Sequence, residues 1–430
     1  MPARLTRAWS MQCRPRVPRG LARSALPRAR LTDAMSGAWI MSQWQKRGLF
    51  AWLMFPLSLV YRIAGAARRK LYSSRLKRAF KARVPVIVVG NIYVGGTGKT
   101  PVILSLLAAL TARGWRPGLV SRGYGSRSKR RPLCGQGTID AAEFGDEPAM
   151  ISMLTGISVS VFPDRALAVE ALLDFDPAIN VILSDDGLQH WALARDIEIL
   201  VQDERGCGNG LTLPAGPLRE PPARMLEVDA VLTRQPHDKL SQRQSGLLDE
   251  STNSREACPG NDRSSHPVVH ARFAVVVDRF RHLATGRELS PEQWVAEAGS
   301  KAGGILAIAG IGVPERFFAN LRSLGVNPDR TLALPDHGDI DKAWLARQAE
   351  GTILMTEKDA VKLVTRRAAI EATTAMQAAG PQTDSVHDRI WVATARTAWC
   401  DDSFFDWVET RLQTVSHERL KRDGQLSQKR

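Results

Sequence analysis

The chain has 430 residues, of which 44% are hydrophobic and 24% are charged, and this composition excludes an intrinsically disordered protein. The formal net charge of +15 suggests a nucleic-acid binder, but the charge is unevenly distributed. Residues 1–83 contain 19 of the 59 basic residues and a single acid, Asp33, so this segment carries +18 and the remainder −3. A basic end also suits an anionic membrane surface or a targeting signal. The motifs below favour the membrane, and we expect no nucleic-acid partner.

Residues 1–40 form an Arg- and Pro-rich lead without hydrophobic periodicity, to which we assign no role in the fold. Such an acid-poor segment is typical of a transit peptide. Alternatively, it lies upstream of a later start at Met35 or Met41.

Residues 48–61 form an uncharged, mostly apolar run of 14 residues, shorter than the roughly 20 that a helix needs to cross a bilayer. The run contains Trp52 and Tyr61, aromatic types that favour the membrane interface. Basic residues flank it on both sides, namely Lys46, Arg47, Arg62, Arg68, Arg69 and Lys70. We therefore expect residues 41–83 to associate with an anionic membrane through a helix that lies on its surface. A buried first helix of the fold and the apolar region of a signal peptide are the alternatives.

From residue 84 the pattern becomes that of an α/β protein. Residues 84–90 are a short, apolar, β-branched run, as expected for a strand buried on both faces of a parallel sheet. Residues 101–113 have helical spacing and end before Gly114. Further strands are predicted at 117–121, 178–183, 197–202 and 229–233. The alternation predicts a doubly wound sheet, which we interpret as a P-loop NTPase-type domain over residues 84–236.

The remaining sequence predicts a second, smaller α/β domain joined by a two-stranded β linker. Residues 237–267 are polar and are interpreted as a surface insertion or mobile linker. The connector, residues 268–290, is predicted as two strands at 268–277 and 279–289. A strand at 304–309 leads through a Gly-Ile-Gly turn into a helix that ends near residue 324, and further strands are expected at 352–355 and 390–393. We place the smaller domain at 291–415 and a polar tail at 416–430.

The strongest chemical signal is the glycine-rich sequence Gly95-Gly-Thr-Gly-Lys99-Thr100, directly after the first predicted strand. A phosphate chain needs converging backbone N–H donors and a helix N-terminus, which such a loop provides. Lys99 would reach the β- and γ-phosphates, and the Thr100 hydroxyl would bind Mg²⁺. Tyr93 stands where the usual pattern has its first glycine, so this is a variant P-loop.

A P-loop also needs an acidic group for the metal at a strand end. The apolar residues 181–184 lead directly into Asp185 and Asp186, about 85 residues after the loop. Such an aspartate holds Mg²⁺ directly or through water. A simple Asx turn at the end of a strand is the alternative.

Phosphoryl transfer to an alcohol requires a base that accepts the hydroxyl proton. Asp146 and Glu147 stand at a predicted helix start, where they could instead serve only as partners of the helix dipole. His337, in the second predicted domain, could orient such an aspartate.

The ordered run of motifs resembles the tetraacyldisaccharide 4′-kinase family. The resemblance covers residues 41–410 and is carried by seven sequences: Gly90-Asn91 through Pro101, Ser121-Arg-Gly-Tyr-Gly125, Gly145-Asp-Glu-Pro148, Asp185-Asp-Gly-Leu-Gln-His190, residues 213–220, Pro335-Asp-His337 and Thr356-Glu-Lys-Asp359. It implies transfer of the ATP γ-phosphate to the 4′-hydroxyl of the tetraacyldisaccharide 1-phosphate precursor of lipid A, giving lipid IVA. It also implies a peripheral or monotopic protein at the cytoplasmic face of the bacterial inner membrane.

The resemblance also implies roles for individual residues. It makes Asp146 the base, His337 its partner, and Asp185 beside Asp186 the metal site. The phosphate loop for ATP comprises Tyr93, Val94, Gly95, Gly96, Thr97, Gly98, Lys99 and Thr100. The residues expected to line the acceptor site are Tyr124, Arg165, Gln189, Arg219 and Glu220.

Two other functions are compatible with a P-loop. A membrane-associated ATPase or GTPase switch without a lipid acceptor is one, although Thr356-Glu-Lys-Asp359 shifts the lysine of the guanine-specific N/T-K-x-D pattern by one position. Val94 also stands where partner-recruiting ATPases have an extra lysine. A soluble small-molecule kinase is the other, and it would not need residues 41–70.

Overall fold

The computed structural model describes residues 39–124, 130–237, 267–297, 303–336, 338, 340–364, 386–400 and 402–427, with the side chains of residues 342 and 422–427 excepted. Three of the regions discussed above lie essentially outside this part of the chain: the basic lead, the polar segment 237–267 and His337.

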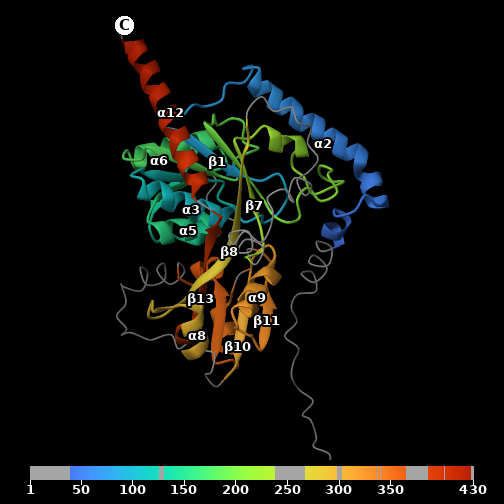
Figure 1. Ribbon diagram of the computed structural model, residues 1–430, viewed down its shortest axis with the longest axis vertical. Coiled ribbons are helices and arrows are strands. Elements are labelled where there is room, and N and C mark those ends of the chain that lie inside the picture. The colour runs from blue at the N-terminus through green and yellow to red at the C-terminus, as the bar shows by residue number, and fades with distance from the viewer. Residues whose placement is uncertain are drawn as a thin grey trace, which may run out of the picture. The chain divides into compact units, whose positions relative to one another are not determined.

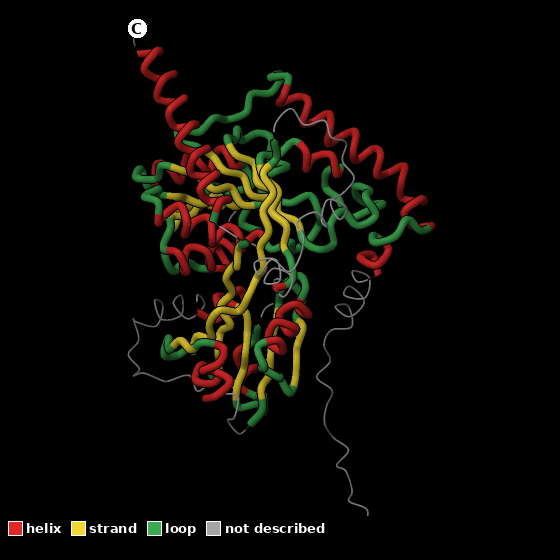
Figure 2. Tube along the Cα trace, in the orientation of Figure 1, coloured by secondary structure: helices red, strands yellow, loops and turns green. Residues whose placement is uncertain are grey.

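One sheet runs through the described chain, in the strand order β11-β10-β12-β13-β8-β7-β6-β1-β5-β2-β4-β3, with β9 paired to β8 (Figure 2). The strands of the first half are β1 (Val86–Gly90), β2 (Pro117–Ser121), β3 (Leu133–Gln136), β4 (Ser158–Val161), β5 (Val181–Asp185), β6 (Ile197–Gln202) and β7 (Ala230–Arg234). The strands of the second half are β8 (Val269–His282), β9 (Glu288–Leu289), β10 (Ile305–Ala309), β11 (Arg330–Ala333), β12 (Thr352–Thr356) and β13 (Ile390–Trp399).

The described helices include α2 (Leu49–Ser73), α3 (Lys99–Ala112), α4 (Ala141–Phe144), α5 (Asp146–Thr155), α6 (Arg165–Phe175), α8 (Pro291–Glu297), α9 (Pro314–Ser323), α10 (Lys342–Ala346) and α12 (Ser403–Ser427). Two short 3₁₀ helices, η1 (Pro222–Leu226) and η3 (His387–Arg389), are also present.

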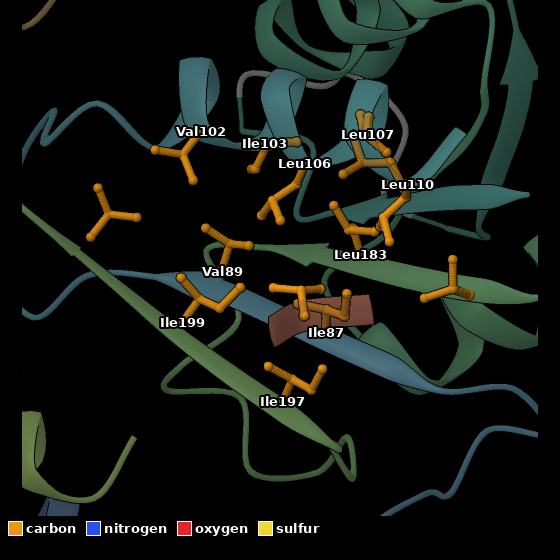
Figure 3. Close-up of a cluster of buried hydrophobic side chains, with 14 of the residues drawn as sticks. Ile87, Val89, Val102, Ile103, Leu106, Leu107, Leu110, Leu183, Ile197 and Ile199 are labelled. Atoms are coloured by element: carbon orange, nitrogen blue, oxygen red, sulfur yellow. The ribbon is translucent and has the colours of Figure 1, made fainter. Parts of the chain in front are cut away.

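The P-loop half is doubly wound, as its strand pattern predicts. Strands β6, β1, β5, β2 and β4 are parallel, and β3 closes the edge antiparallel to β4. Because successive side chains of a strand point to opposite faces, Ile87 and Val89 of β1 join the core beneath α3, whereas Val86 and Val88 join the core beneath α6. Figure 3 shows the first of these cores, with one face of α3 packed on β1, β5 and β6.

The second half repeats this architecture on a smaller scale. Parallel strands β11, β10, β12 and β13 are covered on one face by α8 and α9, through Trp294, Phe317 and Phe318. The other face is covered by Leu345 of α10 and by the helical turn after β12. The prediction of a second α/β unit is confirmed.

The connector between the halves differs from its predicted form. Residues 268–277 and 279–289 were expected to be two strands, but β8 is continuous over Val269–His282, and only Glu288–Leu289 forms a second short strand. The long antiparallel partner of β8 is β13, from far along the sequence (Figure 1). The error arises because strand pairing across such a sequence separation has no local signal. The linker is two-stranded, but its strands are β8 and β13.

The C-terminal helix also differs from its predicted place. Residues up to 415 were assigned to the smaller domain and the rest to a polar tail, yet α12 is a single helix over Ser403–Ser427. Its apolar residues Phe404, Val408 and Leu412 enter the core of the P-loop half. Arg419 forms an ion pair of 2.6 Å with Asp196. The helix is therefore part of the P-loop half, because its apolar residues fill the face beside α3.

Helix α2 extends the predicted apolar run from residues 48–61 to Leu49–Ser73. Most of its large apolar side chains are exposed, among them Trp52 at 68% and Leu53 at 71%. Only Ala51 and Ser58 are buried, which excludes the alternative of a buried first helix. With 25 residues, α2 is long and apolar enough to cross a membrane by length and composition alone.

Candidate active site

The P-loop is held in shape by the side chain of Asn91, which directly follows β1. The buried Asn91 amide donates hydrogen bonds to the carbonyls of Tyr93 (2.7 Å) and Gly95 (3.1 Å) and to the Thr97 hydroxyl (3.1 Å). Its oxygen accepts a bond of 3.3 Å from Lys99 Nζ. Gly98 caps α3 with a φ of +93°, a left-handed conformation that favours glycine. One buried amide therefore spans the loop and aims its lysine.

Tyr93, at the position where the usual motif has a glycine, supports the loop from behind. Its ring is buried, and its hydroxyl accepts a hydrogen bond of 2.8 Å from Gln45. The Arg205 guanidinium lies 4.3 Å from the ring centre and also donates to the Gly96 carbonyl at 2.8 Å. The Val94 amide donates to Pro217 at 2.9 Å. The residues that precede the glycines therefore serve as a rigid support for the loop.

Asp185 ends β5 as predicted and is almost fully buried. Burial raises the pKa of its carboxyl to about 7, an effect that Glu147 strengthens and Lys99 opposes. Ser121 donates a hydrogen bond to this carboxyl at 3.2 Å. Arg165, also buried, donates to the backbone carbonyl of Asp185 at 3.1 Å. Burial lowers the pKa of Arg165 to about 10, so it is still a cation at neutral pH.

Asp186 connects the P-loop to the expected acceptor side of the site. Its backbone has a φ of +50°, which is uncommon for a residue with a side chain. Lys99 Nζ lies 3.4 Å from one carboxylate oxygen, and Arg219 donates to the other at 2.8 Å. Burial alone would raise the pKa of Asp186, but Lys99 and Arg219 outweigh it and hold the pKa below its usual value. Asp186 is therefore the charged member of the aspartate pair.

The predicted residues Gln189 and Glu220 extend this chain of contacts. Gln189 donates to the Glu220 carboxylate at 2.7 Å and to the Asn91 carbonyl at 3.2 Å. Burial raises the pKa of Glu220, although the bond from Gln189 and the nearby Arg224 oppose the effect. Thus Lys99, Asp186, Gln189 and Glu220 form one connected group that begins at the P-loop.

Asp146 is the first residue of α5, at the predicted helix start. Its carboxylate lies 3.4 Å from Lys362 Nζ, which also donates to the Gly338 carbonyl at 2.9 Å. Lys362 belongs to the second half of the chain and is buried there beside Asp359. The site of His337 lies outside the described residues, so its relation to Asp146 stays a prediction.

A second ion-pair group joins the two halves next to Asp146. Lys358 Nζ lies 3.3 Å from Glu147 and 2.8 Å from Asp336. Burial would lower the pKa of Lys358, but the two carboxylates outweigh it and raise the pKa. Lys358 belongs to the Thr356-Glu-Lys-Asp359 motif, but no role was predicted for it, and Lys362 was not predicted at all. Lys358 and Lys362 are four residues apart, so they lie on the same face of a helix, and they follow a strand that ends beside two carboxylates. This pattern is the signal that could have identified them.

Tyr124, which was also predicted to line the acceptor site, follows strand β2. Its side chain is exposed at 69%. Its carbonyl oxygen would lie 2.7 Å from a methyl group on Gly145, which has a φ of +90°. The close packing of these two backbones therefore requires glycine immediately before Asp146.

A pocket opens beside the P-loop between the two halves of the sheet. Thr100 and the P-loop glycines line one side, together with Pro101 and Leu104 of α3. Much of the remaining lining is apolar and comes from β8, β13 and α9, including Val275, Val277 and Phe317. Glu357 also lines it, and burial raises the pKa of this carboxyl to about 7. The pocket combines a phosphate-binding loop with an apolar recess, as a nucleotide requires.

These features agree with the family that matches the sequence. The family model of tetraacyldisaccharide-1-P 4'-kinase matches residues 50–413. The chain belongs to this family. Tetraacyldisaccharide 4'-kinase of Bordetella petrii is 42% identical over 375 residues, which are 87% of this chain and 95% of the relative. The enzyme of the same name from Dechloromonas aromatica is 43% identical over 333 residues, 76% and 89% of the two chains.

The kinase family also accounts for the fold. The crystal structure of LpxK from Aquifex aeolicus in complex with ATP superimposes with a TM-score of 0.62, covering 85% of this chain and 99% of the other at 22% identity. This likeness confirms the predicted α/β architecture. Membership of a kinase family confirms the predicted resemblance and does not favour the nucleotide-switch alternative.

Proposed function

We propose that the protein transfers the γ-phosphate of ATP to the 4′-hydroxyl of the tetraacyldisaccharide 1-phosphate precursor of lipid A, forming lipid IVA. The observation that carries this proposal is the connected group at the carboxyl ends of the parallel strands β1 and β5. It joins the P-loop lysine Lys99 to Asp186, Arg219 and Glu220, with Asp146 at the start of a neighbouring helix. The curated relatives that share most of the chain carry the corresponding enzyme name, which supports the same acceptor.

In this proposal the phosphate chain of ATP binds to Tyr93–Thr100. The left-handed Gly98 presents the start of α3 toward the phosphates, where its dipole favours negative charge. Lys99 would exchange part of its contact with Asp186 for the β- and γ-phosphates. Phosphoryl transfer depends mainly on position and charge, so the prepositioned lysine is the largest contribution of the loop.

The oxygen groups at the end of β5 and at the start of α3 suit a magnesium ion. Asp185, Asp186 and the Thr100 hydroxyl are the hard donors that Mg²⁺ prefers, and a cation beside Asp185 would offset the burial that raises its pKa. We assign these three residues to the metal, which when bound would neutralise charge on the transferred phosphoryl group. Arg165, buried beneath Asp185, would strengthen this positive field.

Asp146 would accept the proton of the attacking 4′-hydroxyl, with His337 as its partner. The ion pair with Lys362 keeps the Asp146 carboxylate in one orientation. Arg219, half-buried and bonded to Asp186, is the cation that would meet phosphate on the acceptor side. Gln189, Glu220 and Tyr124 would line the remainder of the acceptor site.

The acceptor requires the enzyme to work at the membrane. Each buried CH₂ group is worth about 0.8 kcal/mol, so a multiply acylated lipid does not leave the bilayer easily. The exposed apolar face of α2 and its flanking cations would dock the protein to the anionic cytoplasmic face of the inner membrane. Contacts from Ser58 to Thr212 (2.8 Å) and from Trp44 to Pro214 (3.0 Å) fix this region to the P-loop half.

We propose a domain division that the contacts support. A membrane-associating segment at 41–83 precedes a P-loop domain at 84–236, which is completed by α12. The connector is formed by β8 and β13, and the smaller domain lies between them in sequence.

The decisive experiment is transfer of labelled γ-phosphate from ATP to the tetraacyldisaccharide 1-phosphate in mixed micelles. We expect labelled lipid that depends on both the acceptor and Mg²⁺. ATP hydrolysis at the same rate without acceptor would instead support a nucleotide switch. Activity on lipid that survives deletion of residues 41–70 would contradict the proposed membrane docking.

A further inference from the structure

Arg234, the last residue of β7, faces the pocket beside the P-loop. It lines this pocket together with Gly98 and Thr100. A methyl group on Gly98 would lie 3.4 Å from Arg234 Cδ, so the P-loop passes directly against the arginine stem. No role was predicted for this residue from the sequence.

The neighbouring charges leave Arg234 as an excess cation. Asp203 is paired with Arg205 at 2.7 Å and with Arg316 at 2.9 Å, and Glu204 is paired with Arg316 at 2.6 Å. Three arginines therefore lie near two carboxylates, and both carboxylates are already paired with Arg205 or Arg316. Among the described residues, none has a hydrogen bond or ion pair with the Arg234 guanidinium.

The protein holds this cation at an energetic cost. Burial lowers the pKa of Arg234 to about 10, and the like charge of Arg316 adds to the effect. The group is still protonated at neutral pH, so it stays a desolvated cation at the wall of a pocket. An anionic ligand in the pocket would supply the missing partner.

The position of Arg234 indicates which part of a bound nucleotide would lie beside it. Lys99 serves the end of the phosphate chain, and the apolar recess lined by Leu104, Val275 and Phe317 suits the nucleoside. The group that joins nucleoside to β-phosphate is the α-phosphate, and it must pass the P-loop where Arg234 lies.

We propose that Arg234 donates hydrogen bonds to the α-phosphate of the bound nucleotide. This inference rests on the proposed ATP site and adds a residue to it. A guanidinium can donate two parallel bonds to phosphate oxygens, so Arg234 would increase affinity for every nucleotide that has an α-phosphate.

The test is equilibrium binding of ATP, ADP, AMP and adenosine, measured by competition against a fluorescent ATP analogue. Arg234→Gln is expected to weaken ATP, ADP and AMP by a similar factor of about tenfold or more and to leave adenosine unchanged. Arg234→Lys should fall between, because it keeps the charge and loses the planar fork. The unfolding midpoint of each variant checks that it is folded.

Arg272→Gln is the matched control. Arg272 lies on the neighbouring strand β8, opposite Thr233, whereas Arg234 lies opposite Phe273. Because adjacent positions point to opposite faces, removal of the Arg272 charge alters the same sheet on its other face. We expect nucleotide affinity within about twofold of wild type, since this residue does not line the pocket.

Three outcomes would overturn the inference: equal loss for adenosine, loss confined to ATP, and no loss for any nucleotide. Lys99→Ala separates these from failure of the proposed function. If Lys99→Ala weakens ATP and ADP but Arg234→Gln does not, only the inference fails. If Lys99→Ala has no effect, the P-loop assignment itself is wrong.

Discussion

Two strand–turn–helix units of the molecule look alike in sequence and differ in chemistry. In the first, β1 leads through the P-loop into α3, and in the second, β10 leads through Gly310-Ile-Gly312 into α9. The two turns approach each other, because a methyl group on Gly312 would lie 3.4 Å from the Gly96 nitrogen. Both need glycine, but for different reasons.

In the second unit the protein supplies its own anion. The Gly310 amide donates to Asp359 at 2.8 Å, and a methyl group on Gly310 would lie 2.6 Å from the other oxygen of that carboxylate. Helix α9 then begins with Pro314, which has no N–H to donate. In the first unit the loop carries Lys99 and no carboxylate. In this molecule an internal carboxylate occupies the second turn, whereas the proposed phosphate site in the first turn contains no acidic residue of its own.

The largest expected effect is on phosphate transfer, and it comes from a substitution in the first unit. Lys99→Ala should reduce phosphate transfer about 10³-fold or more, because the phosphates lose their prepositioned cation. The measurement is labelled transfer from ATP to the lipid acceptor. Arg113→Ala is the control, since Arg113 pairs with Asp406 and Glu409 at the far end of the same helix. Activity of Lys99→Ala near that of the control would contradict the assignment.

The next effect concerns Asp146, which contacts the second unit through Lys362. Asp146→Asn should lower turnover by about 10²- to 10⁴-fold with little change in the KM for ATP, if this carboxylate is the base. Steady-state kinetics at varied ATP measure both parameters. Glu147→Gln removes the adjacent carboxylate of the same helix start and should cost much less. Equal losses would indicate a shared structural role at the helix start.

A smaller effect should follow from removal of the internal anion of the second unit. Asp359→Ala leaves the Gly310 amide, the Thr356 hydroxyl and Lys362 without their buried partner. We expect the free energy of unfolding to fall by about 2–4 kcal/mol, measured by urea denaturation. Asp174→Ala, at an exposed acid, is the control. Unchanged stability would mean that the carboxylate contributes nothing to this turn.

The smallest effect is a pH dependence of protein stability, which arises from a carboxyl group in the pocket between the units. The pKa of Glu357 is raised from 4.5 to about 7, so the folded state binds its proton more tightly than the unfolded state. Its contribution to stability is complete below about pH 4.5 and is lost as pH rises toward 7. Glu357→Gln should remove this dependence and stabilise the protein at pH 8 by roughly 1–3 kcal/mol. If urea denaturation shows that the free energy of unfolding changes with pH in the same way for the variant and the wild type, Glu357 is not the origin of the pH dependence.

The first half of the chain was largely predictable because its signals are local. Strands β2 and β6 have the predicted bounds. Strand β6 is a mostly apolar run between Asp196 and Asp203, and β2 is a short run between Arg116 and Arg122. Asp185 follows from the same logic, as the polar end of such a strand. Strand β3 was missed, because Leu133–Gln136 is an edge strand that is only partly buried.

The failures involve contacts between distant segments. The pairing of β8 with β13 and the return of α12 depend on complementary surfaces that no local pattern records. The same applies to Lys362 and Arg234, which reach the site from separate elements. A sequence motif identifies functional groups within one loop. It does not identify the cations of other elements that lie beside this loop only in the folded protein.

The packing of α12 sets an order for the synthesis of the molecule. Strands β1, β5 and β6 are complete by residue 202, yet Phe404, Val408 and Leu412 belong to the same core. Chains generally fold from the N-terminus during translation, but here the nascent P-loop half cannot complete this core until residue 412 has left the ribosome. The nucleotide-binding half is thus the first to be translated and among the last to be finished.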